Sequence, residues 1–459
     1  MDLSQQKQTW VTTGFILVSG FVLFYNLGAK SLENHGYLRY AEIAREMIRS
    51  GEWVVPHYNG EIYIEKPPLL FWLMAIPSWF YGSVTPLTAR LPSALSAWAG
   101  VLILFLWGRR VYGTVQAGII SGCLCLMSFQ YFFEARNPKT DMLFCLMIVL
   151  SLYFFYLGYD TNRRKSYLFY GLSFFSMGLG TLTKGPVGIV IPIMIVAAFL
   201  LKERQIKILV SREFLFGWAV FAVTVLIWVT LFINKVGWEQ SIALVKSTGV
   251  MTRRAPIYFY ILKICGQFFP VSLTLPFLFL YLWRKRGERL QPGEPFLLTW
   301  FVLLFVLLTL YTFRASRYLL PVLPPLALMA GGMLRKRFLH VVIVFCLFVL
   351  IWHGVEWHRI GKNLSRSPGM VLAGELRPVL GEETVSGYEL DVSTVEELNF
   401  YLDRVIPILK EAEHLSGKRF ILVPEKVFRD LKARGHGSLY FLREFRYEGE
   451  RLFLISTMD

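Results

Sequence analysis

Long apolar segments recur along most of the chain, and they constrain its fold more than any motif does. Hydrophobic residues make up 55% of the 459 residues and charged residues only 17%, while the mean hydropathy is +0.48. This composition excludes an ordinary soluble globular protein. We predict a mainly α, polytopic transmembrane helix bundle of about eleven spans. The predicted spans are residues 11–27, 93–107, 117–133, 142–157, 167–182, 187–201, 214–233, 257–283, 296–313, 318–333 and 338–355.

Compact basic clusters occur in every second loop between these segments. They are residues 109–110, 163–165, 202–212, 284–286 and 335–337. Positive residues collect in cytoplasmic loops, so these loops and the N-terminus are predicted to be cytoplasmic and the other loops and the C-terminus external. The net charge of +16 is therefore interpreted as a topology signal, and no nucleic-acid partner is indicated.

The first external loop, residues 31–87, carries acids, bases, histidines and aromatics between apolar neighbours. We call it the head and expect the functional residues to gather there. Residues 38–48 have the spacing of an amphipathic helix, and residues 69–80 form an almost wholly apolar helix after Pro67-Pro68. Both helices are expected to lie at the membrane interface.

The composition changes after residue 355, which separates a transmembrane domain, residues 1–355, from a small soluble α/β domain, residues 356–459. We call the second part the tail. Residues 384–390, 405–409, 420–423 and 452–456 have the pattern of strands, and residues 394–402 and 427–434 that of helices. The tail has no nucleotide loop, metal spacing or nucleophile motif, which favours a lid or docking role.

Several motifs in one order resemble those of the aminoarabinose-to-lipid A transferases, bacterial relatives of the protein O-mannosyltransferases. The motifs are RYAEIAREM at residues 39–47, GEWVVPHYNG at 51–60, YIEKPP at 63–68, TD at 140–141, LTKGP at 182–186 and RYLLP at 317–321. The resemblance implies an inverting glycosyltransferase in the bacterial inner membrane. It would take a polyprenyl-phosphate-linked sugar as donor and a lipid, glycan or protein as acceptor on the periplasmic side, among membrane lipids.

A lipid-phosphate leaving group becomes negatively charged as the glycosidic bond breaks, so cations must converge on it. The external turns supply such cations, each beside aromatic or acidic residues. Together with the resemblance, this gives a predicted substrate-binding set of Arg39, Tyr40, Glu65, Lys66, Lys184, Arg314, Arg317 and Tyr318.

An acceptor also needs a carboxylate to align or deprotonate it. The family pattern places an Asp-Glu pair three residues before the Arg-Tyr-Ala motif, where this chain has Gly36-Tyr37. We therefore predict Asp141 as the catalytic acid, followed by Glu33 and then His35. The alternative for Glu33 and His35 is a capping turn for the helix that follows.

A divalent metal is a further candidate cofactor, with His57 and Glu65 as weak ligands, because two ligands at unspecific spacing do not define a site. No phosphate-binding glycine loop is present, which disfavours a nucleotide-sugar donor.

Two other functions stay open. The Gly36-Tyr37 substitution favours an inactive relative or an accessory subunit that binds lipid phosphate. A lipid flippase or transporter would also be polytopic and basic, although it would usually place its polar residues near mid-membrane.

Overall fold

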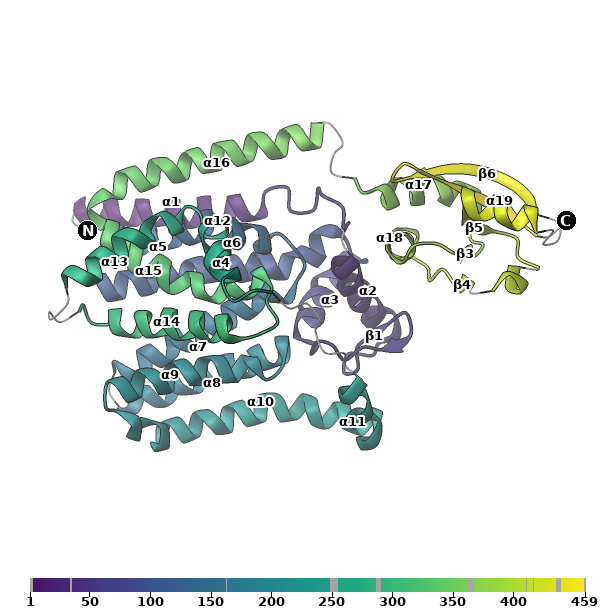
Figure 1. Cartoon of the computed structure of the whole chain (residues 1–459). Coiled ribbons are helices and arrows are strands. Elements are labelled where there is room, and N and C mark those ends of the chain that lie inside the picture. The colour runs from purple at the N-terminus through teal and green to yellow at the C-terminus, as the bar shows by residue number, and fades with distance from the viewer. Residues whose placement is uncertain are drawn as a thin grey trace.

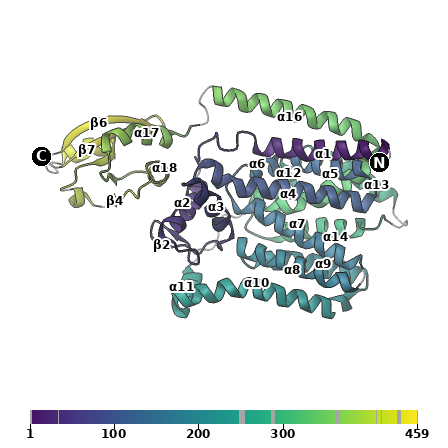
Figure 2. The same cartoon turned by 180° about the vertical axis from the view of Figure 1, so that it is seen from behind.

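The computed structural model gathers the helices of the first 361 residues into one bundle, with the smaller tail at one end of it (Figure 1). The front view and the view from behind both place α16 (Phe338–Gly361) and α10 (Arg212–Val236) at opposite edges of the bundle (Figure 2). The structure describes residues 3–33, 35–161, 163–247, 255–285, 290–361, 366–409, 411–415, 417–434 and 439–457.

Each of the predicted apolar ranges contains a helix or a broken pair of helices. The other elements of the head and bundle are α1 Leu3–Phe24, α2 His35–Ser50, β1 His57–Tyr58, β2 Glu61–Ile62, α3 Leu69–Tyr81, α4 Pro86–Tyr112, α5 Val115–Met127, α6 Phe129–Ala135, α7 Thr140–Tyr159, α8 Arg163–Lys184, α9 Val187–Lys202, η1 Ile206–Val210, α11 Trp238–Ser247, α12 Phe259–Gln267, η2 Val271–Thr274, α13 Leu275–Arg284, α14 Glu294–Leu310, η3 Ser316–Val322, α15 Leu323–Leu334 and η4 Arg335–Arg337.

The bundle has the character of a multi-pass membrane protein. Within the described residues, four helical runs are long and apolar enough to cross a membrane, or up to six if each bent pair is one span. The bent pairs are α5 with α6, at 73°, and α12 with the run from η2 to α13, at 106°. Helices α3, α9 and α14 are apolar but shorter. The prediction of a mainly helical membrane fold is confirmed, and the span number of eleven stays a prediction.

The head is built from α2 and α3, which pack together, and from a short hairpin between them. The hairpin turns at Asn59-Gly60, where both residues have positive φ, as the tight turns of antiparallel strands require. The carboxylate of Glu46 on α2 accepts hydrogen bonds from the backbone amides of both turn residues, at 2.5 and 3.2 Å. The hairpin is thereby fixed to the polar face of α2.

A tight turn joins α8 to α9 and carries Lys184 at its start. Gly185 has φ of 81°, a conformation that glycine adopts without strain. Behind the turn, a Cβ on Gly188 would lie 2.2 Å from the carbonyl carbon of Gly180. The two helices therefore touch through their backbones, as small residues allow in membrane bundles, and Lys184 is fixed at the bundle end.

The tail is a mixed five-stranded sheet with helices, which confirms the predicted α/β character. The strand order is β4-β3-β5-β7-β6, with β3 parallel to β4 and β5, and β7 antiparallel to β5 and β6. The sequence pattern did not predict α17 or β6. The elements are α17 Pro368–Leu380, β3 Ser386–Tyr388, α18 Val392–Leu402, β4 Ile408–Leu409, η5 Ala412–Leu415, β5 Ile421–Pro424, α19 Glu425–Ala433, β6 Tyr440–Tyr447 and β7 Glu450–Ser456.

Helix α18 docks the tail onto α2 of the head. Arg45 on α2 is buried, and its guanidinium donates to Glu42 on its own helix at 3.1 Å. The same group donates to the carbonyls of Asn399 and Phe400, at 2.9 and 2.8 Å, and pairs with Asp403 at 2.6 Å. Burial raises the pKa of Glu42, and the neighbouring Arg45 opposes this shift. The Arg45 guanidinium is therefore one of the groups that connect the head to the tail.

Replacing Arg45 with alanine is expected to loosen this docking. The change would leave the carboxylate of Glu42, whose side chain is 5% exposed, without its cation, and breaking a buried ion pair typically costs about 3–5 kcal/mol. Hydrogen–deuterium exchange of the α18 amides should rise by orders of magnitude, while exchange within α7 stays unchanged.

Arg49→Ala is the matched control on the same helix. Arg49 also pairs with Asp403, at 2.5 Å, but the two side chains are 47% and 56% exposed, so the pair contributes less than about 1 kcal/mol. Equal exchange in the two variants would contradict the assigned role of Arg45.

Candidate functional site

Three residues predicted from separate motifs meet where the head covers the bundle end. Asp141 lies in the first turn of α7, where the helix dipole favours an acid, and its side chain is 5% exposed. The Nζ atom of Lys184 lies 2.5 Å from its Oδ1, and Nε of Arg317 on η3 lies 3.7 Å from its Oδ2. A buried carboxylate is thus held between two cations from distant parts of the chain.

Aromatic rings surround the two cations. The ammonium of Lys184 lies 5.1 Å from the ring centres of both Phe144 and Tyr318. The guanidinium of Arg317 lies 5.5 Å from the Tyr318 ring. Ring faces attract cations and restrict water, so the charges of this cluster act in a medium of low polarity.

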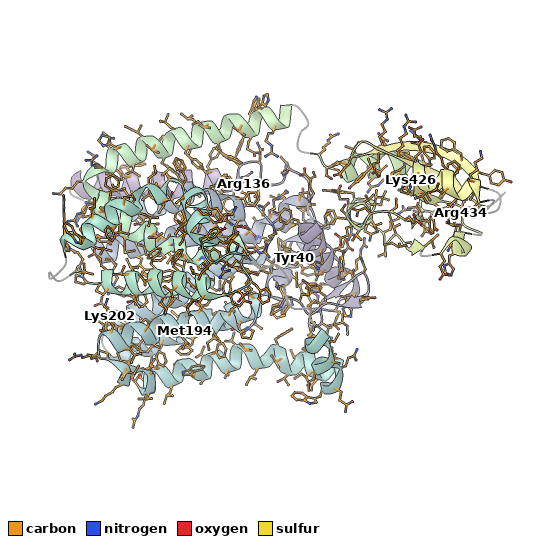
Figure 3. All side chains as sticks on the ribbon, in the orientation of Figure 1. Tyr40, Arg136, Met194, Lys202, Lys426 and Arg434 are labelled. Atoms are coloured by element: carbon orange, nitrogen blue, oxygen red, sulfur yellow. The ribbon has the colours of Figure 1, made fainter. Side chains whose placement is uncertain are left out.

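The head adds Arg39 and Tyr40 from α2, and Figure 3 labels Tyr40 near the junction of head and bundle. Arg39 pairs with Glu65 at 3.4 Å and lies 5.6 Å from the ring centre of Tyr63. Burial, followed by the charge of Asp141, raises the pKa of Tyr40 to about 12. Tyr40 is therefore a neutral hydroxyl at physiological pH.

Lys66 occupies the loop just before α3. Its Nζ donates to the carbonyl of Glu65 at 2.9 Å. Burial lowers the pKa of Lys66, and the nearby positive charge of Lys184 lowers it further. Two ammonium groups that repel each other in this way mark a place suited to an anion.

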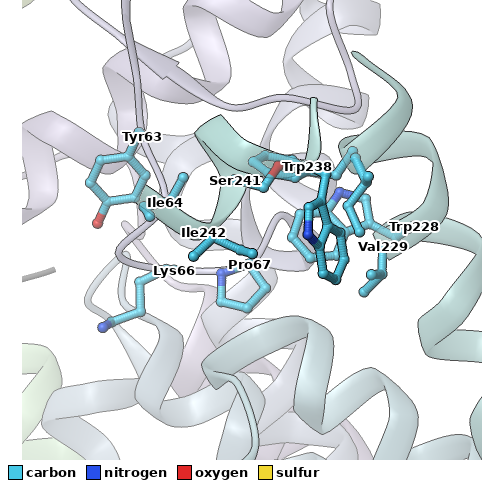
Figure 4. Close-up of a pocket in the computed structure, with 11 residues that line it drawn as sticks. Tyr63, Ile64, Lys66, Pro67, Trp228, Val229, Trp238, Ser241 and Ile242 are labelled. Carbon is cyan, nitrogen blue, oxygen red and sulfur yellow. The ribbon is translucent and has the colours of Figure 1, made fainter. Parts of the chain in front are cut away.

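An apolar cavity of about 440 Å³ opens beside Lys66 (Figure 4). It lies between the loop before α3 and the helices α10 and α11, and it leaves little polar surface apart from the lysine. The indole of Trp228 donates to the carbonyl of Val54 at 2.9 Å, which ties α10 to the head beside the cavity. The cavity is lined by Tyr63, Ile64, Lys66, Pro67, Trp228, Val229, Phe232, Ile233, Trp238, Ser241 and Ile242.

Not every predicted residue joins this cluster. Glu33 pairs with Lys30 at 3.2 Å and accepts from Ser31 at 3.4 Å, whereas the cation partners of Asp141 are Lys184 and Arg317. Helix α2 begins at His35, whose side chain lies outside the described residues. Arg314 donates to the carbonyls of Ala255 and Thr309, so it braces the backbone of a neighbouring turn.

The candidate metal ligands His57 and Glu65 are also placed by the structure. Glu65 pairs with Arg39, and His57 begins strand β1. Among the described residues, no group of three or more His, Cys, Asp and Glu side chains is placed to hold a metal ion.

One acid that the sequence analysis did not identify also lies in this region. Glu134 on α6 is 4% exposed and within electrostatic reach of Asp141 and Lys139. Lys139 in turn lies 4.8 Å from the ring centre of Tyr37. The available signal was weak, because Glu134 directly follows the apolar range of residues 117–133 and resembles the polar end of a span.

Comparison with known proteins places this chain in a family. Residues 65–231 match the family model of the dolichyl-phosphate-mannose-protein mannosyltransferases. A protein of Aquifex aeolicus (strain VF5) is 30% identical over 346 residues, which cover 73% of this chain and 67% of that protein. The chain belongs to this family.

Within the family, one curated relative is the undecaprenyl phosphate-alpha-4-amino-4-deoxy-L-arabinose arabinosyl transferase 1 of Pseudomonas fluorescens (strain Pf0-1). It is 28% identical over 342 residues, which cover 72% of this chain and 58% of the relative. The chain thus spans less than two thirds of that relative's length.

Solved structures show the same fold. ArnT from Cupriavidus metallidurans in the apo state has a TM-score of 0.82 at 20% identity and covers 98% of both chains. The same protein bound to undecaprenyl phosphate gives 0.81, with coverage of 97% of this chain and 98% of that one. The predicted membership in the polyprenyl-phosphate sugar transferases is confirmed.

The repulsion between Lys66 and Lys184 can be measured. Only a neutral amine is acylated, so a lysine with a lowered pKa reacts at lower pH. In Lys184→Met, the loss of the positive charge should raise the pKa of Lys66 and move the pH midpoint of its acylation upward. Mass spectrometry of pulse-acylated protein gives that midpoint, and Lys139→Met is the matched control, expected to shift it less. An unchanged midpoint in Lys184→Met would contradict the proximity.

Proposed function

We propose that this protein moves a sugar from a polyprenyl-phosphate carrier to a lipid, glycan or protein acceptor on the periplasmic side of a bacterial inner membrane. One observation carries the proposal. A buried carboxylate, Asp141, is held between Lys184 and Arg317, and Lys66 lies close to this cluster at the rim of an apolar cavity.

The cavity and its lysine suit the carrier lipid. A prenyl chain is apolar, and cavities that bind such groups are lined by hydrophobic and aromatic side chains with a few polar anchors. Lys66 would hold the phosphate, with Arg39 beside it, because charge-assisted bonds to phosphate are strong. Undecaprenyl phosphate bound to ArnT in a structure of the same fold is consistent with this assignment.

The reaction balances without an added cofactor. The bond between the anomeric carbon and the phosphate oxygen breaks, and its electron pair stays on the phosphate, where the cations stabilise the charge. The acceptor oxygen forms the new bond from the opposite face, which gives inversion, and its hydroxyl proton is in the end taken up by water. The carboxylate of Asp141 would orient the acceptor and stabilise positive charge on the sugar ring.

The docking of the tail supports the predicted topology. Because α18 contacts α2 through Arg45, head and tail lie on the same side of the membrane, which requires an even number of crossings between them. The predicted ranges from residues 93–107 to 338–355 are ten, an even number. Lys202, from a basic cluster, lies far from Tyr40 at the other end of the bundle (Figure 3), as a cytoplasmic placement requires.

Two alternatives remain as proposals. An inactive relative or accessory lipid-phosphate-binding subunit is favoured by Tyr37, which stands where the family pattern has an acid. A flippase or transporter is disfavoured because the charged cluster lies at helix ends, in the first turn of α7 and the last turn of α8, and not near the middle of the helices.

Asp141→Asn should lower the transfer rate by about 100-fold or more, since it removes charge from the reacting centre but keeps the shape. The assay follows label from a polyprenyl-phosphate sugar into acceptors of a membrane extract, with purified protein in vesicles. Asp160→Asn is the matched control at the other end of α7. Asp160 is 53% exposed and pairs with Arg110 at 2.8 Å, so its loss should leave the rate within about twofold. Full activity in Asp141→Asn would refute the carboxylate mechanism, and an inactive parent would favour the accessory-subunit alternative.

Reporter fusions test the orientation. A reporter joined after Arg337 should be cytoplasmic and one joined after residue 459 periplasmic, because α16 crosses between them under the proposed topology. If both reporters were found on the same side of the membrane, this arrangement would be wrong.

A further inference from the structure

Glu134 is a buried acid, and among the described residues only one of its two oxygens finds a hydrogen-bond partner. Its Oε1 accepts from the side-chain amide of Gln130 at 2.9 Å, one turn earlier on α6. Its Oε2 is buried and has no hydrogen-bond partner in the described part of the chain. A buried unpaired oxygen is costly, because it has lost its hydrogen bonds to water and gained none in the protein. Packing alone does not explain this acid.

The charges around Glu134 come from several elements. Among these charges, that of Asp141 on α7 acts most strongly on Glu134. Lys139, Arg317 and Lys184 act on it from the loop before α7, from η3 and from α8. Glu134 is therefore part of the same electrostatic cluster as the Asp141 site. The short helix α6 reaches this place because it bends by 73° away from α5.

The charge of Glu134 also acts on Tyr37, at the position where the family pattern expects an acid. Tyr37 on α2 occupies that position, and its pKa lies above its usual range because of burial and then because of the charge of Glu134. Tyr37 is accordingly a neutral phenol. Helix α6, which carries Glu134, also packs against α7 and η3, the elements that carry Asp141 and Arg317.

We propose that Glu134 is the general base for a neutral hydroxyl acceptor, in place of the acid that Gly36-Tyr37 lacks. This rests on the proposed function and names its acceptor class. The acceptor oxygen bonds to the anomeric carbon as the bond to phosphate breaks, the phosphate keeps that electron pair, and the hydroxyl proton passes to Oε2 of Glu134. A phosphate acceptor is already anionic and would need no base, so a second carboxylate is suited to a hydroxyl.

The test uses the full chain in vesicles with a labelled polyprenyl-phosphate sugar and membrane extract. Glu134→Gln should lower kcat by about 100-fold or more, the usual contribution of a general base, with little change in the donor KM. Binding of polyprenyl monophosphate without sugar should stay within about twofold of the parent. The transfer rate of the parent should fall as the pH is lowered, because Glu134 gains a proton. This fall is the acidic limb of the pH–rate profile, and Glu134→Gln should lack it.

Two further variants separate chemistry from structure. Glu134→Asp keeps a carboxylate and should retain both measurable transfer and the acidic limb. Gln130→Ala removes the hydrogen-bond donor to Oε1 of Glu134. It should keep most of the transfer rate, with the acidic limb displaced along the pH axis. If the hydrogen bond between Gln130 and Glu134 were only structural, Gln130→Ala would be as slow as Glu134→Gln.

The outcomes also separate this inference from the proposed function. An active parent with an unchanged rate and acidic limb in Glu134→Gln would overturn the role of Glu134 and leave the transferase intact. Label found on a phosphate oxygen of the product would refute the hydroxyl acceptor. A parent without transfer from any carrier lipid would overturn both proposals.

Discussion

The buried ion pair between Asp141 and Lys184 is the interaction on which the arrangement of this protein depends. Charges removed from water must be paired, because an isolated buried ion costs several kcal/mol. The carboxylate begins α7, and the ammonium ends α8, so the pair fixes the relative height of two neighbouring helices. Arg317 ties η3 to the same point from more than a hundred residues further along the chain. The fold thus places positive charge at one end of an apolar bundle.

The head converts this charged end into an enclosed site. Helix α2 brings Arg39 and Tyr40 over it, and the loop before α3 brings Lys66 and one wall of the apolar cavity. Cations at such a boundary interact more strongly with a phosphate than they would in water, because little solvent screens them. The apolar chain of a lipid would contact the cavity wall, and its anionic group would contact the neighbouring cations.

Much of the site could be predicted because its residues lie in recognisable motifs. Asp141, Lys184 and Arg317 come from three such motifs, and the structure joins them as ion pairs. Arg314 was predicted to bind substrate, but its guanidinium donates to backbone carbonyls. The sequence does not show which guanidinium groups will bond to the backbone in this way. Glu134 was missed for a different reason. Its neighbours are apolar, and only the bend between α5 and α6 brings it to the charged cluster.

The contact of Arg45 on α2 with α18 has a consequence for the order in which the protein folds during synthesis. Helix α2 is made early, yet the carbonyls that receive Arg45 belong to residues 399 and 400, which the ribosome adds more than 350 residues later. Until that segment has been made, the guanidinium must find other partners, and the acidic residue beside it stays only partly shielded. A chain stalled during translation would therefore carry every membrane helix and still present an unfinished α2 to proteases. The packing of α2 is therefore complete only after residues 399 and 400 have been made.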